Sequence, residues 1–315
     1  MMTVSILRVA RPEFVPIMAP LTHQSVSLPP SDISKTLFDN VRVYCFIIST
    51  KNRTEEKARH VQATWAKRCN KHVFVTANEA SGLPSLDFGL KESRVNLFAK
   101  IEHTLKHIYK NELNNYDFFL KADYDTYVVM ENLRFMLLPY SPDDPLTFGC
   151  RLRYMNQYYM SGGAGYVLSR EAIRRIVEKG FGKLPQCAPS NRVGEDVEIG
   201  ECMNALNVKA VDTRDRQGRH RMVLFSPSMH LVPKPVDKNL RHYMANPYEH
   251  GEQCCGDYIV SFHYINTGMM YVLDALFYRL RRVGSIDEKW NGINMSNGDL
   301  VGALRKFSVE QSIVA

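Results

Sequence analysis

Two aspartates separated by one residue follow an apolar stretch of the chain. The stretch runs from Phe118 to Leu120, and the carboxylates belong to Asp123 and Asp125. In an extended chain alternate side chains point the same way, so both carboxylates can face one point. Carboxylates brought together repel one another unless a cation compensates them, and hard oxygen ligands suit Mg²⁺ or Mn²⁺ holding a phosphate. The other interpretation is an ordinary junction of strand and loop, where aspartate is common and such a triplet arises by chance.

The elements that must position this pair alternate between strand and helix patterns. Apolar runs at 41–49 and 72–76 predict buried strands, a polar helix is expected at 54–65, and apolar residues recur at helical spacing over 97–108. The alternation predicts an α/β fold with a mainly parallel central sheet flanked by helices. Such sheets bind ligands beyond the carboxyl ends of their strands, which is where the paired aspartates stand.

A glycine-rich stretch precedes a helix predicted at 169–178. Its order, Gly162-Gly163-Ala164-Gly165, does not match the G-x-G-x-x-G of a dinucleotide-binding loop. Glycine is favoured where the backbone bends tightly or must approach a ligand closely. A tight turn that lines a pocket and a purely structural turn are both consistent with these residues.

Two further groups could take part in chemistry. Glu195 and Asp196 stand at the head of a predicted helix, where acidic residues are favoured because they offset unpaired amides and the helix dipole. Their type alone therefore does not establish catalysis. An alternating strand over 258–264 carries His263. A histidine there is either structural or the nitrogen ligand that completes a carboxylate metal site.

The composition restricts the class of protein. The chain has 315 residues, 45% of them apolar, and can bury a large core as one big domain or two small ones. Its formal charge of +7 comes from scattered basic residues rather than a basic stripe, so nucleic-acid binding is not expected. Seven cysteines without C-x-x-C spacing favour disulfides in a secretory compartment. No run approaches the roughly 20 apolar residues of a membrane span.

Together these patterns predict three segments. Residues 1–35 contain five prolines and no sustained period, and are expected to form a flexible lead-in. Residues 36–283 are expected to form the folded domain. A peripheral C-terminal tail is expected at 284–315.

Five stretches taken together resemble the β1,3-glycosyltransferases of family 31, with the strongest likeness to the members that make the core 1 O-glycan. The resemblance runs in the same order over about residues 40–283. The stretches are 58–65, 121–127, 159–169, 195–197 and 261–264.

This resemblance implies a GT-A fold in a type II membrane protein of the Golgi lumen. Residues 36–283 would form its catalytic domain, with a donor half at about 36–150 and an acceptor and catalytic half at about 151–283. It implies transfer of galactose from UDP-galactose, with Mn²⁺, to O3 of N-acetylgalactosamine (GalNAc) on Ser or Thr of glycoproteins. The expected partners are the UDP-sugar and the glycoprotein acceptor. The resemblance leaves homodimer formation open.

The resemblance also assigns residues to the donor. It implies that Asp125 and His263 hold Mn²⁺ against the diphosphate, and that Asp123 assists at the metal or at the ribose. Arg59 and Gly163 are expected to contribute to donor binding, Gly163 because the sugar could approach its backbone.

For the acceptor, the resemblance implies inversion at the anomeric carbon with Asp196 as the base and Glu195 as its neighbour in the donor site. The cysteines other than Cys150 match those of core 1 relatives, which implies three disulfides and one extra thiol.

Two departures from the family pattern affect specificity. The family usually reads Asp-Asp-Asp where this chain has Asp123-Tyr124-Asp125, so donor choice and rate are open. The segment around 231–252 matches poorly, so acceptor preference is open as well. The alternatives are an inactive relative that binds or chaperones another transferase, and the same chemistry with another donor or acceptor.

Overall fold

The computed structural model describes residues 32–49, 54–76, 82–91, 93–155, 157–189, 194–280, 297–310 and 312. Residues 1–31, which are most of the predicted lead-in, lie outside the described residues. So do residues 281–296, which are the end of the predicted domain and the start of the predicted tail. The predicted division into donor and acceptor halves stays a prediction. Among the described residues, no helix combines the length and apolar character needed to cross a bilayer.

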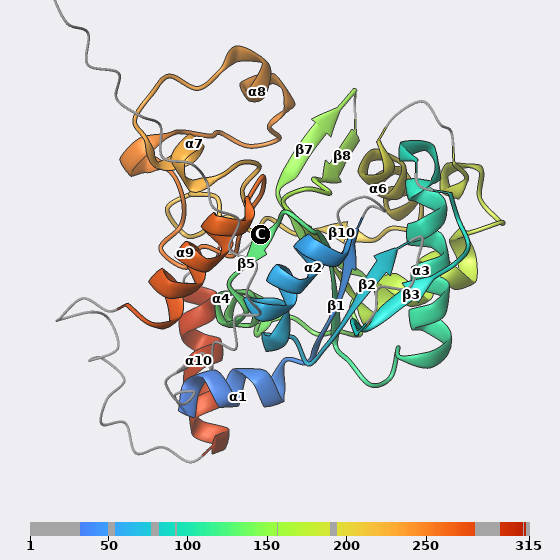
Figure 1. Ribbon diagram of the computed structural model, residues 1–315, viewed down its shortest axis with the longest axis horizontal. Coiled ribbons are helices and arrows are strands. Elements are labelled where there is room, and N and C mark those ends of the chain that lie inside the picture. The colour runs from blue at the N-terminus through green and yellow to red at the C-terminus, as the bar shows by residue number, and fades with distance from the viewer. Residues whose placement is uncertain are drawn as a thin grey trace, which may run out of the picture.

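A mixed sheet forms the centre of the fold (Figure 1). Within the described residues it has seven strands in the order β10, β6, β9, β4, β1, β2, β3. Every neighbouring pair is parallel except those that β9 makes with β4 and β6. The prediction of a mainly parallel α/β sheet is therefore confirmed. The strands are β1 (Val43–Ile48), β2 (Lys71–Thr76), β3 (Ser85–Asp87), β4 (Phe118–Asp123), β6 (Leu146–Gly149), β9 (Tyr166–Ser169) and β10 (Lys209–Ala210).

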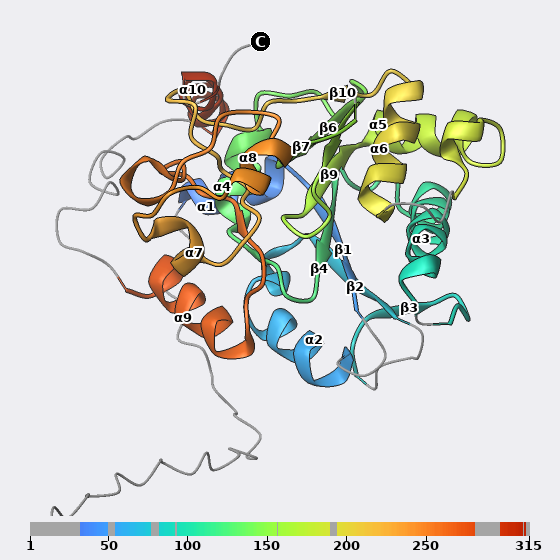
Figure 2. The same ribbon diagram turned by 90° about the horizontal axis from the view of Figure 1, so that it is seen from above.

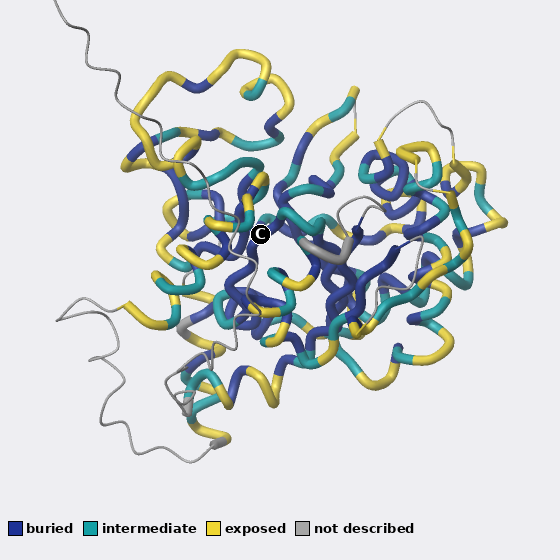
Figure 3. Tube along the Cα trace, viewed as in Figure 1, coloured by how far each residue is buried: buried dark blue, intermediate teal, exposed yellow. Residues whose placement is uncertain are grey.

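Strand β1 shows why both faces of the sheet are covered. All of its residues are buried, and the alternation of side chains divides them between two separate cores. Val43, Cys45 and Ile47 join one core, whereas Tyr44 and Phe46 join the other. In Figure 3 the central strands are accordingly dark blue.

Helices cover the two faces of the sheet (Figure 2). One face is packed against α2 (Thr54–Ala63) and α4 (Met130–Leu137), and the other against α3 (Leu97–Asn111), α5 (Arg170–Arg175) and α6 (Glu195–Ala205). Helix α5 continues as the π-helix η3 (Ile176–Gly180). The short 3₁₀ helices are η1 (Ala66–Arg68), η2 (Arg94–Asn96), η4 (Pro185–Cys187) and η5 (Gly251–Gln253).

Smaller elements lie beside the sheet. Strand β5 (Tyr127–Val128) pairs antiparallel with β11 (Ser261–Phe262), and β7 (Arg151–Tyr154) with β8 (Gln157–Met160). The strand predicted over 258–264 is thus reduced to the two residues of β11. The helices here are α7 (Pro227–Leu231), α8 (Lys238–Tyr243) and α9 (Thr267–Tyr278).

The two ends of the described chain pack on the same helix. Helix α1 (Asp32–Asn40) and helix α10 (Asn297–Glu310) both contact α4 (Figure 1). Leu304 of α10 is buried, and the Ser308 hydroxyl donates to the carbonyl of Phe135. The part of the expected tail that the structure describes therefore lies on the outside of the fold and is anchored to it.

The described cysteines form three disulfides and leave one buried thiol, as the resemblance implied. Cys45–Cys69 joins β1 to the segment after η1, Cys187–Cys202 joins η4 to α6, and Cys254–Cys255 links neighbours. Burial raises the pKa of the Cys150 thiol to about 12. Because the thiolate is the reactive form, this thiol is expected to be inert.

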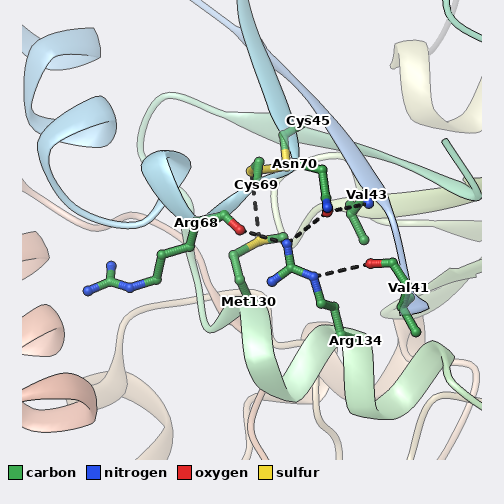
Figure 4. Close-up of a disulfide and its surroundings, with 8 residues drawn as sticks. All are labelled: Val41, Val43, Cys45, Arg68, Cys69, Asn70, Met130 and Arg134. Atoms are coloured by element: carbon green, nitrogen blue, oxygen red, sulfur yellow. Dashed lines mark hydrogen bonds between the residues drawn. A yellow bond between two sulfur atoms is a disulfide. The ribbon is translucent and has the colours of Figure 1, made fainter. Parts of the chain in front are cut away.

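A buried arginine fastens α4 beside the first disulfide (Figure 4). The Arg134 guanidinium donates to the carbonyl of Arg68 at 2.6 Å, to Oδ1 of Asn70 at 2.9 Å and to the carbonyl of Val41 at 3.2 Å. These acceptors flank the Cys45–Cys69 bridge. The helix that follows the aspartate pair is therefore held against the start of β1.

Candidate metal and catalytic site

The aspartate pair lies in the turn that connects β4 to β5. Asp123 is the last residue of β4, its carbonyl accepts from the amide of Thr126 at 3.0 Å, and its amide donates to the Thr126 hydroxyl at 3.2 Å. Asp125 stands inside this turn. The pair is therefore at the carboxyl end of a central strand, where parallel sheets bind ligands.

His263 reaches the same point from far along the chain. Strand β11 pairs with β5 directly after the turn, with Phe262 opposite Tyr127, and the amide of Ile265 donates to the carbonyl of Asp125 at 2.8 Å. These hydrogen bonds set the imidazole beside the carboxylates.

The three side chains form a metal-binding constellation. His263 Nε2 lies 3.4 Å from Oδ1 of Asp125 and 4.0 Å from Oδ2 of Asp123. One ligand atom from each residue lies within 4.8 Å of the others. Two carboxylates and one imidazole suit a divalent cation such as Mn²⁺, because oxygen and imidazole ligands are both acceptable to it. The structure thus brings together the residues predicted to hold the metal.

The glycine-rich turn packs against this cluster. The Thr126 hydroxyl donates to the carbonyl of Gly163 at 2.8 Å, and the Ser261 hydroxyl donates to the carbonyl of Ala164 at 2.6 Å. A Cβ atom at Gly163 would lie 2.1 Å from Cε1 of His263. Gly163 therefore lacks a side chain because the imidazole occupies that space.

We expect Gly163→Ala to weaken Mn²⁺-dependent UDP binding by about 10- to 100-fold, the range for losing the support of a metal ligand. The new methyl group must displace the His263 ring. Titration calorimetry of UDP with Mn²⁺ measures the effect. Gly302→Ala in α10, where a Cβ has open space, is the control and leaves the affinity unchanged. Unchanged affinity in both variants would contradict the packing argument.

A buried lysine links the metal cluster to the head of α6. Lys121 is 1% exposed, and its ammonium donates to Oδ1 of Asp123 at 2.8 Å and to the carbonyl of Gly162 at 3.1 Å. It also lies 3.7 Å from Oε2 of Glu195, whose other oxygen accepts from the Tyr166 hydroxyl at 2.8 Å. Lys121 and Tyr166 therefore fix the carboxylate of Glu195, which was predicted to lie in the donor site, on the other side of Lys121 from Asp123.

Burial and charge act together on this pair. Burial by itself lowers the pKa of Lys121, but the carboxylates of Asp123 and Glu195 outweigh it and raise the pKa above its usual value. Burial raises the pKa of Glu195 to about 7, against the opposing effect of the Lys121 charge. The ammonium therefore stays charged and neutralises part of the acidic site.

The sequence reading missed Lys121, although a signal was present. A lysine inside the apolar strand Phe118–Asp123 has no reason to be buried unless a carboxylate compensates it. Tyr166 offered no such signal, because an aromatic residue in a buried strand is ordinary.

Replacing Lys121 with methionine is expected to lower the free energy of unfolding by about 3–5 kcal/mol, because it leaves the buried Glu195 and the partly buried Asp123 without their cation. Urea denaturation followed by circular dichroism measures the change. The matched control is Lys106→Met, which breaks an exposed i,i+4 pair with Glu102 and should change stability by less than about 1 kcal/mol. A similarly small loss in both variants would show that Lys121 is not a buried counter-charge.

Asp196 lies on the other side of the glycine turn. Its Oδ2 atom accepts from the amide of Gly162 at 2.9 Å, and its Oδ1 atom accepts from the amide of Val197 at 3.0 Å. Asp196 is half-buried in the first turn of α6. The turn at Gly162 and Gly163 thus separates this carboxylate from His263 by a single layer of backbone.

Two other positions complete the comparison with the sequence. Arg59 lies on the exposed side of α2, and its role toward a donor stays a prediction. Tyr124, the departure inside the aspartate motif, has the ammonium of Lys57 4.5 Å from its ring centroid. The neutral ring therefore still attracts a cation from α2, by a cation–π contact.

Comparisons with known proteins identify relatives of this chain. A family model described as Fringe-like matches residues 39–217, which include the aspartate turn and Asp196. The chain is 40% identical over 258 residues to glycoprotein-N-acetylgalactosamine 3-beta-galactosyltransferase 1 of Xenopus laevis, covering 81% of this chain and 71% of that protein. It is 28% identical over 182 residues to a beta-1,3-glucosyltransferase of Mus musculus, covering 56% of this chain and 33% of that protein. It is 24% identical over 182 residues to a beta-1,3-glucosyltransferase of Homo sapiens, covering 56% of this chain and 32% of that protein.

Proposed function

This chain belongs to the Fringe-like family of glycosyltransferases, and we propose that it transfers galactose from UDP-galactose to O3 of GalNAc on Ser or Thr of glycoproteins. The observation that carries the proposal is the convergence of Asp123, Asp125 and His263 on one side of the glycine turn, with Asp196 on the other. The Xenopus relative, whose name states this activity, supports the choice of donor sugar and acceptor.

The donor is held at the end of β4. Asp125 and His263 would hold Mn²⁺, and Asp123 would assist with the oxygen that Lys121 does not occupy. When bound, the metal neutralises the charge that develops on the leaving diphosphate. Arg59 contributes to donor binding from α2.

The acceptor hydroxyl reacts beside α6. Asp196 takes the proton of the O3 hydroxyl while that oxygen attacks the anomeric carbon of galactose from the face opposite UDP, so the configuration inverts. The hydrogen bond from the Gly162 amide orients the carboxylate. Glu195, fixed by Lys121 and Tyr166, holds the head of α6 in place. Gly163 contributes to donor binding by leaving room for the His263 imidazole beside the carboxylates.

The disulfides bear on the cellular compartment of the protein. Disulfides persist in oxidising compartments, and the described cysteines form three of them, which supports the secretory pathway. We propose the Golgi lumen, with Mn²⁺ as the metal and a type II membrane anchor as in the family. Homodimer formation stays a prediction.

An assay with purified protein, Mn²⁺, a panel of UDP-sugars and a GalNAc-α-Thr peptide tests the function. We expect transfer from UDP-galactose and a product that β1,3-galactosidase cleaves. Transfer from another donor, such as UDP-GlcNAc, would correct the proposed donor and point to Tyr124 as the cause of the changed donor choice. No turnover with any donor, together with tight binding to another transferase, would replace the enzyme with a binding partner.

A further inference from the structure

A hollow lies in a part of the chain that contains neither the metal cluster nor Asp196. It has a volume of about 430 Å³ and is lined by residues of α7, α8 and the segments around them. Phe225, Met229, Leu240 and Tyr243 give it an apolar and aromatic lining. Lys234 and Asp237 add charges of opposite sign. This size and this mixture of many apolar groups with a few polar ones are typical of small-ligand sites.

A row of aromatic rings connects the hollow to the metal cluster. The ring of Tyr264 stacks on His263 with 4.0 Å between ring centroids. It also stacks on Phe225, a lining residue of the hollow, with 5.9 Å between ring centroids. The carbonyl of Phe225 also accepts from the amide of His263 at 3.3 Å. The metal ligand and the lining of the hollow are therefore one continuous structure.

Tyr264 is held in an unusual position. It is 60% exposed, and its backbone has φ of 55°. This left-handed region is uncommon for residues other than Gly and, less often, Asn, Asp and His. An aromatic ring kept at the surface in a strained conformation beside a reaction site is an indication of function rather than of packing.

A buried histidine holds the backbone of the lining residue Phe225. His230 is fully buried, and its Nε2 atom accepts from the amide of Phe225 at 2.8 Å. Burial and, to a smaller extent, the neighbouring His250 and His220 lower the pKa of His230 to about 3, so the ring is a neutral acceptor. The same ring packs against Tyr248 at 5.4 Å between centroids. A pre-organised wall loses little conformational entropy on binding.

The position of the hollow in the chain indicates which part of the substrates it binds. The Fringe-like match ends at residue 217, before the lining begins. The lining overlaps the segment 231–252 that departs from the family pattern. A hollow in a segment that departs from the family pattern is suited to a group that differs between relatives, such as the acceptor.

We propose that this hollow, with Tyr264 at its entrance, binds the peptide of the acceptor and seats an apolar side chain close to the glycosylated Ser or Thr. This inference rests on the proposed function. The stacked rings of His263, Tyr264 and Phe225 form a continuous surface from the metal cluster to the hollow, along which the peptide of a bound acceptor can extend. The aromatic and apolar lining matches a proline or valine flank.

Binding to the full chain in the presence of UDP and Mn²⁺ tests the inference without turnover. The probes are a GalNAc-α-Thr peptide with proline and valine flanks, and methyl α-GalNAc, which has the sugar but no peptide. Tyr243→Ala and Met229→Ser change lining residues that are 51% and 43% exposed, so folding should be kept. We expect both variants to weaken glycopeptide binding about tenfold, as expected for losing one buried anchor, and to leave methyl α-GalNAc binding unchanged.

The control is Val95→Ser, at a 60% exposed apolar residue of η2, next to α3 on the opposite side of the molecule from α7 and α8 (Figure 1). It should change neither affinity. Glycopeptide affinity that is equal in the parent and both variants would overturn the inference, as would an equal loss for both probes. A change of oligomeric state in the variants, with peptide affinity kept, would assign the hollow to contacts between copies of the chain.

Turnover is measured in parallel, so that the two proposals fail separately. A parent that binds the glycopeptide through these residues but transfers no galactose keeps the peptide site and loses the proposed function. A parent that transfers galactose equally well to the glycopeptide and to methyl α-GalNAc keeps the function and loses the peptide site.

Discussion

Asp196→Asn is expected to lower the rate of galactose transfer by about 10²- to 10⁴-fold, the usual contribution of a general base, while UDP still binds with Mn²⁺. The amide cannot take the proton of the acceptor hydroxyl. Its oxygen can still accept the hydrogen bond from Gly162, so the glycine turn and His263 should stay in place. Initial rates at saturating UDP-galactose and calorimetric UDP affinity separate the two effects.

This variant also distinguishes catalysis from the ordinary role of an acidic residue at a helix N-terminus. Loss of that charge should lower stability by about 0.3–1 kcal/mol, which is far too little to explain a large fall in rate. Glu201→Gln, in the same helix α6, is the matched control and should keep full activity. A rate within tenfold of the parent would leave Asp196 with the structural role alone.

The second large effect is expected from Asp125→Ala, which should weaken Mn²⁺-dependent UDP binding by more than about 100-fold, beyond the usual loss from an outer-shell change. The variant removes a carboxylate that lies 3.4 Å from His263 Nε2. Ligand-induced stabilisation provides an independent measurement. At a UDP·Mn²⁺ concentration 100 times the Kd, the parent should gain about 2.7 kcal/mol of stability, and the variant almost none.

The control for this experiment is Asp143→Ala, which removes an exposed carboxylate paired with Arg170. It should retain the UDP-dependent stabilisation of the parent. The unliganded Asp125→Ala protein should be as stable as the parent, because the change removes a carboxylate from an acidic cluster rather than a buried partner. Equal UDP affinity in the parent and Asp125→Ala would refute the metal role of this residue.

Much of the architecture could be predicted from local patterns. The apolar runs of β1 and β4 and the helical spacing of α3 gave the alternating α/β order, because burial on both faces requires such runs. The aspartate pair could be placed at a strand end for the same reason. Shorter elements were less predictable: β11 has two residues, since its length depends on pairing with β5 and not on its own pattern.

What the sequence determined by itself is the chemistry on offer: carboxylates at the end of β4, an acidic head for α6, and a histidine near the end of the fold. What only the tertiary structure decided is that these groups meet. His263 reaches Asp125 through the pairing of β11 with β5, and Gly163 is needed because that imidazole fills the space of a side chain. Lys121 is stable inside the sheet only because distant Glu195 and nearby Asp123 compensate it. Such contacts join residues far apart in the chain, and no local propensity encodes them.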